Sequence, residues 1–158
     1  MIYYIGGDHV SILTVASGQS VYRGYEYSQS KKVLHMEHCG EGIIQAIVSG
    51  SGNCTYDVIV DEAHPRKSQC TCPHATGKRI VCKHMVAVYF AAHPLEAKKY
   101  IEDLEAYWEE EEQRQEEQAD NLIKYVHSMK KSELQAALLQ LLFDGPDWQY
   151  DRFIEENL

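Results

Sequence analysis

The spacing of apolar residues over the first 60 positions changes from an irregular pattern to a strand-like one. Residues 1–31 have mixed periodicity, and we interpret them as two short helices. Residues 33–37, 42–49 and 54–60 have the alternation or β-branched content that is typical of strands. Gly-containing segments connect them, which suits tight turns. The pattern predicts a three-stranded antiparallel meander.

Apolar residues return at helical spacing after position 84. Residues 85–92 are mostly apolar and predict a short helix packed on the sheet. His93 and Pro94 end this helix, and Pro94 also suits the first position of the next one, which continues over residues 95–108.

Residues 109–118 contain no apolar side chain. Their Glu and Gln content favours a helix, so we expect an exposed helical connector. The alternative interpretation is an acidic surface that attracts a basic partner or mimics nucleic acid.

Apolar spacing resumes at residues 122–129. Ser132 and Gln135 predict a capping box for a helix that ends before Gly145, and a last helix follows. Leucines at this density favour the core of a helical hairpin or small bundle over a stripe that binds a partner.

Charge is distributed unevenly along the 158 residues, whose formal net charge is -9. Residues 64–90 carry five Lys or Arg and no Asp or Glu, whereas both flanking regions are acidic. The basic side chains could attract an anionic partner or simply offset the charge of nearby thiolates. They are Arg66, Lys67, Lys78, Arg79 and Lys83.

Two short pairs of soft ligands lie within the basic segment. Cys70 and Cys72 are two residues apart, as are Cys82 and His84, and nine residues separate the pairs. Because alternate residues of an extended segment point to the same side, each pair can hold one ion. Three thiolates and an imidazole suit tetrahedral zinc, and four protein ligands leave no open position for a catalytic water.

Other ligands are conceivable. His74 could replace His84, although it follows Pro73 and would lie awkwardly close to Cys72. Cys39 and Cys54, with histidines near Cys39, could form a second metal site, but ordinary thiols are the simpler interpretation. An odd number of cysteines argues against a disulfide framework, and zinc thiolates require a reducing compartment.

The arrangement C-x-C-x9-C-x-H, preceded by a β-hairpin and followed by an apolar helix, resembles the SWIM-type zinc finger. The resemblance covers about residues 20–92 and implies a ββα zinc-binding fold with ligands Cys70, Cys72, Cys82 and His84. Members of this family occur alone, beside helicase-like ATPases, in transposases and with recombination factors, which implies binding to DNA or proteins. The residues that carry it are Arg23-Gly24, Gly50 to Val60, Ser68 to Pro73 and Cys82 to Val88.

We therefore expect an α+β fold in which a small three-stranded antiparallel sheet and a zinc-bound finger are followed by helices. The expected domains are residues 1–93, a SWIM-type zinc finger domain with N-terminal helices, and residues 94–158, an acidic helical region.

We expect a zinc-binding interaction module that contacts DNA or a DNA-processing protein through the basic residues. The alternative is an adaptor that binds a protein through the acidic helices, such as a helicase-like ATPase or a recombination protein. No nucleophile–base pair or phosphate loop is present, so we expect no enzymatic activity. The first 20 residues lack a signal peptide or membrane span, and we expect a cytoplasmic protein.

Overall fold

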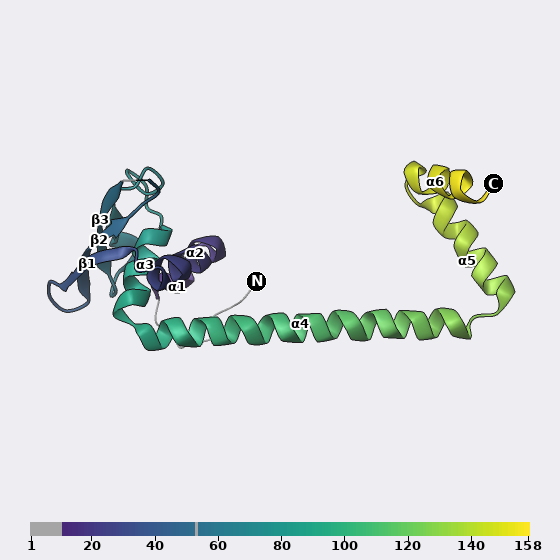
Figure 1. Ribbon diagram of the computed structural model, residues 1–158, viewed down its shortest axis with the longest axis horizontal. Coiled ribbons are helices and arrows are strands. Elements are labelled where there is room, and N and C mark those ends of the chain that lie inside the picture. Colours follow the sequence, from purple (N-terminus) through teal and green to yellow (C-terminus); the bar gives the residue numbers. More distant parts are fainter. Residues whose placement is uncertain (1–10, 53) are drawn as a thin grey trace. The chain divides into compact units, whose positions relative to one another are not determined.

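A computed structural model describes residues 11–52 and 54–158 in two compact units (Figure 1). Unit 1 comprises residues 1–105 and unit 2 comprises residues 106–158. The part of the predicted N-terminal helices that falls on residues 1–10, and Asn53 of the second predicted turn, lie outside the described residues. The domain boundary expected after residue 93 remains a prediction.

The described part of unit 1 begins with two helices, as the sequence pattern predicts. Helix α1 spans Ile12–Val15, and α2 spans Gly18–Gln29. The Ser11 hydroxyl accepts a hydrogen bond from the Leu13 amide, and the Ser17 hydroxyl accepts one from the Ser20 amide. Both serines thus satisfy an amide that a helix start leaves without a partner.

The sheet has four antiparallel strands rather than the three predicted. They follow chain order as β1 (Val33–His38), β2 (Ile43–Ser49), β3 (Thr55–Asp61) and β4 (Gln69–Cys70). The prediction of the first three is confirmed. Strand β4 has only two residues and pairs Cys70 with Val58, which is too short for an apolar pattern to reveal. It adds the first metal ligand to the edge of β3.

One face of the sheet packs on a helix to form the core. Ile44 and Val48 of β2 and Val58 and Val60 of β3 are buried and alternate with more exposed neighbours. Helix α3, Lys83–Ala92, packs on β3 and is buried along most of its length. Helix α2 in turn packs on α3 (Figure 1).

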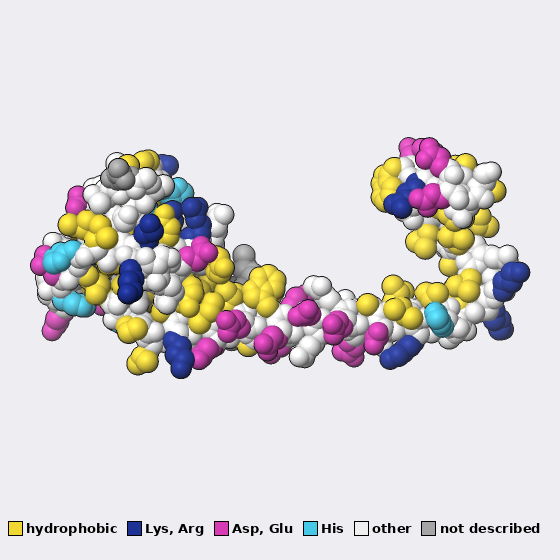
Figure 2. Space-filling view, in the orientation of Figure 1, with side chains coloured by type: hydrophobic (Ala, Val, Ile, Leu, Met, Phe, Trp, Pro, Cys, Tyr) yellow, Lys and Arg dark blue, Asp and Glu magenta, His cyan; other side chains and the backbone are white. Residues whose placement is uncertain are grey.

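Helix α4 spans Pro94–Ser128 and runs from unit 1 into unit 2. Near its start, Ala97 is buried, and the Tyr100 ring lies 5.3 Å from the ring of Phe90 on α3. The Tyr89 hydroxyl donates a 2.5 Å hydrogen bond to Glu96. The acidic residues 109–118 are helical, as predicted, and Asp and Glu side chains are seen along α4 in Figure 2.

Unit 2 ends with α5 (Lys131–Asp144) and α6 (Asp147–Asn157). The predicted capping box is wrong, because α5 begins one residue before Ser132. Instead, the Glu133 carboxylate accepts a 2.7 Å hydrogen bond from the Lys130 amide. Pro146 precedes α6, and the ring of Phe143 stacks on that of Tyr150.

The leucines of unit 2 do not form the predicted core. Leu142 is the one large apolar side chain of this unit that is buried, whereas Leu139 is 53% exposed, Leu141 62% and Phe143 69%. Helical spacing identified the helices correctly, but it could not show whether the chain itself covers their apolar faces.

No helix in the described ranges combines the length and apolar character needed to cross a membrane.

Candidate metal centre

Strand β4 positions the first two ligands. The amide of Thr71 donates to the Asp57 carbonyl, and the Asp57 amide donates to the Thr71 hydroxyl, so the segment after β4 stays extended along β3. In an extended segment the side chains of Cys70 and Cys72 point to the same side. Both side chains are buried.

A tight loop returns the chain from Cys72 to the second pair of ligands. The Cys72 carbonyl accepts hydrogen bonds from the amides of Ala75 and Thr76 and from the Thr76 hydroxyl. Gly77 has a φ of +72°, a conformation that glycine adopts without strain. Ala75 is buried and anchors the loop to the core.

Helix α3 holds the other two ligands. Cys82 is the N-cap residue of α3, and His84 lies in its first turn. Because α3 is also the main apolar partner of the sheet, a metal bound here joins the sheet edge to the helix that covers it. The site is thus part of the folding core rather than an attachment to it.

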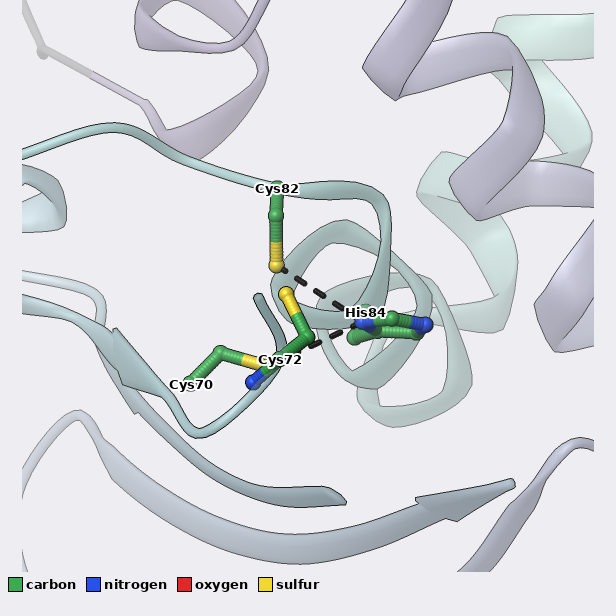
Figure 3. Close-up of side chains that lie close together, drawn as sticks. All are labelled: Cys70, Cys72, Cys82 and His84. Carbon is green, nitrogen blue, oxygen red and sulfur yellow. Dashed lines mark hydrogen bonds between the residues drawn. The ribbon is translucent and has the colours of Figure 1, made fainter. Parts of the chain in front are cut away.

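The four ligand atoms form a cluster with the dimensions of a zinc site (Figure 3). All lie within 4.8 Å of one another, and His84 Nδ1 is 3.7 Å from Cys70 Sγ and 3.9 Å from Cys82 Sγ. Tetrahedral zinc with bonds of about 2.3 Å to sulfur and about 2.0–2.1 Å to nitrogen places these atoms about 3.6 Å apart. The two nitrogen–sulfur distances are therefore close to those expected around bound zinc.

The electrostatics of the cluster also favour a cation. A hydrogen bond from the Cys70 thiol lowers the pKa of Cys82, and the same bond together with burial raises the pKa of Cys70. One buried thiolate thus depends on a neighbouring proton for its stabilisation. Zinc would replace that proton and hold all three sulfurs as thiolates.

The orientation of His84 assigns Nδ1 as the metal ligand. Nδ1 faces the sulfurs, whereas Nε2 points away from them, is buried and has no hydrogen-bond partner (Figure 3). With Nδ1 on the metal, Nε2 carries the proton. The rings of Tyr27 and Tyr56 lie 5.4 and 4.8 Å from the imidazole and fix its position.

The alternative ligands are not brought together. His74 is exposed and outside the cluster, and Cys39 and Cys54 are exposed free thiols. Within residues 11–52 and 54–158, no second group of three or more His, Cys, Asp or Glu residues has the spacing of a metal site.

This combination of a β-strand edge, a short loop and a helix start is what the resemblance of the sequence implies. Residues 56–93 match the SWIM zinc finger family. This segment, called the SWIM finger below, contains all four cluster residues, and its buried Cys3His cluster is positioned to bind zinc. Neither a search of curated proteins nor a search of solved structures returned a significant match.

The five basic residues fall into two groups. Arg66 and Lys67 lie on a single turn, η1 (Pro65–Lys67), that follows the Asp61 end of β3. The loop with Lys78 and Arg79 lies beyond Cys72, past the opposite end of β3. At about 3.3 Å per residue, the strand separates the two groups by on the order of 20 Å.

Lys83 differs from the other four because it is engaged within the fold. Its Nζ donates a 2.7 Å hydrogen bond to the Tyr27 hydroxyl and lies 4.1 Å from the centre of that ring. The sequence pattern did not identify Tyr27 and Tyr56 as neighbours of the metal ligand, because nothing in their spacing relates them to His84. The match of Tyr56 to the SWIM pattern was the available signal for one of them.

Proposed function

We propose that this chain is a protein-binding adaptor in which zinc stabilises the SWIM finger and the helices of unit 2 bind a protein partner. The exposed apolar surface of unit 2 carries this proposal. Soluble monomers seldom expose large contiguous apolar surface, and such surfaces commonly mark interaction sites.

Helix α5 illustrates the need for a partner. Leu138, Leu139, Leu141 and Phe143 are all exposed, and at about 100° per residue their directions cover more than half of the helix circumference. A helix that is apolar on most sides is stable in water only when it is covered. Helix α6 covers only part of α5, beside Phe143 and Tyr150.

The chemistry of the partner follows from the charges around this surface. Residues 106–158 carry thirteen Asp or Glu and five Lys or Arg. Like charge would oppose a second acidic surface, and complementary charge favours a basic one. The SWIM resemblance implies a helicase-like ATPase or a recombination protein as the class of partner. The acidic charge and the exposed apolar surface of unit 2 favour a partner with a basic apolar groove. We assign no enzymatic activity to the chain, and we place it in the cytoplasm, where zinc thiolates stay reduced.

Site-specific photocrosslinking in cells tests this function. A photoreactive phenylalanine analogue at Phe143 should give one dominant adduct with a protein of different mass, whereas the same analogue at Glu112 of α4 should not. The Phe143 position is exposed and apolar, and Glu112 is exposed within the acidic segment. Equal, weak labelling at both positions would contradict the proposal. An adduct of twice the chain mass would indicate self-association instead.

DNA binding through unit 1 is the second candidate. Arg66, Lys67, Lys78 and Arg79 are exposed, and none of their side chains makes an ion pair or hydrogen bond with another described residue. Four phosphate contacts would give a slope of log affinity against log salt no steeper than about -3.6. The separation of the two groups by the sheet means that a single short duplex segment would have to span both ends of β3.

Fluorescence anisotropy with labelled single-stranded and duplex DNA at two salt concentrations tests this candidate. Replacing Lys78 and Arg79 by Gln should weaken binding and reduce the slope by about two, because each phosphate contact adds about 0.9. Absence of binding by the unmodified zinc-loaded chain at low salt would remove the DNA candidate and leave the adaptor.

A further inference from the structure

A cleft beside the zinc cluster has no role in the functions proposed above. Its volume is about 410 Å³, and it lies between the start of α2, the turn after β2 and the loop of residues 73–81 that joins the two ligand pairs, called the SWIM loop below. The ligands Cys72, Cys82 and His84 form part of its wall. A zinc ion held between atoms less than 4.8 Å apart occupies only a small part of this volume. Space remains for a further group.

The lining of the cleft has the chemistry of an anion site. Among the described residues it contains Arg23, Lys83 and His74, together with the polar side chains of Ser17, Gln19 and Ser20, and no Asp or Glu. Such a lining is unusual in a chain with a net charge of -9. The amino-terminal end of the 12-residue helix α2 also faces it, and this end of a helix dipole favours anions.

The charge of the cleft stays positive when zinc is bound. Zinc with three thiolates and a neutral imidazole has a formal charge of -1, whereas Arg23 and Lys83 together contribute +2. Lys83 is held by Tyr27 but retains further N–H donors. The negative charge of the zinc cluster therefore offsets one of the two cations, and the positive charge of the other remains available to an anion.

One cation at the cleft has no protein partner. The Arg23 side chain is exposed and makes no hydrogen bond or ion pair with the residues that the structure describes. Its guanidinium donors are therefore available to a ligand with acceptor oxygens.

We propose that this cleft binds a phosphate group, with the Arg23 guanidinium as its principal charged contact and the start of α2 as a second source of donors. Arginine presents planar, paired donors that match phosphate oxygens. The phosphate belongs either to a DNA strand or to a small phosphorylated compound. The DNA version rests on the second candidate function, whereas the cleft itself does not.

The test compares Arg23→Gln with Arg66→Gln in the full zinc-loaded chain. Both changes remove one exposed, unpaired guanidinium, but Arg66 lies on η1, outside the cleft. The probes are inorganic pyrophosphate, followed by NMR of the backbone amides, and a labelled single-stranded oligonucleotide, followed by anisotropy. Zinc content and melting temperature should match the unmodified chain in both variants, because neither side chain has a partner to lose.

We expect pyrophosphate to shift the amides of residues 18–20 and 23, and Arg23→Gln to weaken its binding about tenfold, which corresponds to about 1.4 kcal/mol. Arg66→Gln should leave pyrophosphate binding unchanged. Pyrophosphate binding without oligonucleotide binding would support the cleft, identify a small phosphorylated compound and remove the DNA candidate.

Three results would overturn the cleft proposal. They are no amide shift with pyrophosphate, equal effects of Arg23→Gln and Arg66→Gln on pyrophosphate, or shifts confined to residues outside the cleft. If oligonucleotide binding persisted in any of these cases, the DNA function would stand without the cleft.

Discussion

Gly24 lies where α2 crosses α3 most closely, and replacing it with Ala should destabilise unit 1. A Cβ at position 24 would lie 2.5 Å from Val86 Cγ1, 2.6 Å from Val86 Cβ and 3.0 Å from the Lys83 carbonyl oxygen. Non-bonded carbon atoms normally approach to about 3.5–4.0 Å. The two helices would therefore have to move apart by on the order of 1 Å.

Two opposing terms decide the size of the effect. Gly→Ala in a helix interior gains up to about 1 kcal/mol in helix propensity. Overpacking of a core costs about 1–3 kcal/mol, and the high end applies here because Val86 is completely buried and its branched side chain has one preferred rotamer in a helix. We expect a net loss of about 1–2 kcal/mol. His84 lies between Lys83 and Val86 on α3, so displacement of these two residues should also lower the affinity for zinc.

Urea unfolding of the zinc-loaded chain measures this effect, with Gly18→Ala as the matched control. Gly18 lies in the same helix, and a Cβ there would meet nothing within 4 Å. The midpoint should fall for Gly24→Ala and stay the same or rise for Gly18→Ala. Val86→Ala should lower the free energy of unfolding by less in the Gly24→Ala chain than in the unmodified chain. If Gly24→Ala were as stable as Gly18→Ala, the close packing of α2 on α3 would be refuted.

Two further predictions concern the metal and the base of α4. Cys82→Ser should lose zinc and unfold unit 1, since structural zinc contributes on the order of 10 kcal/mol, whereas Cys39→Ser, at an exposed thiol, should keep one zinc per chain and an unchanged melting curve. A zinc-loaded Cys82→Ser chain that melts normally would contradict the assignment of this ligand. Tyr89→Phe should cost about 1 kcal/mol at neutral pH through loss of the hydrogen bond to Glu96. Burial, then this hydrogen bond, raises the pKa of Tyr89 above 10, so its stabilisation is complete below pH 10 and is lost at higher pH. The stability difference between the two chains should therefore shrink in alkaline urea titrations, and a difference that does not depend on pH would argue against the hydrogen bond.

The sequence was most informative where local chemistry determines structure. The three long strands follow from alternation in segments such as residues 55–61. The ligand set follows from two i, i+2 pairs, one on extended backbone after β4 and one at the start of α3. The start of α4 at Pro94 follows from the fixed φ of proline. Each of these features is decided within a few residues.

The features that sequence reasoning missed depend on contacts between distant residues. Strand β4 exists because Cys70 pairs with Val58, and two residues have no period to detect. The exposure of Leu141 and Phe143 depends on which surfaces the chain covers, whereas helical spacing is the same in either case. Residues of α2 and of the SWIM loop line the cleft around Arg23 together. They are about 50 residues apart in the sequence, and no local pattern relates them.

X-ray absorption at the zinc edge, on the full chain with Cys39 and Cys54 both replaced by Ser, tests the central claim most directly. The account predicts one zinc per chain with three sulfur ligands at about 2.3 Å and one nitrogen ligand at about 2.0–2.1 Å. Zinc bound by fewer than three sulfurs, or no bound zinc, would contradict the proposal that Cys70, Cys72, Cys82 and His84 join the sheet to α3 through the metal.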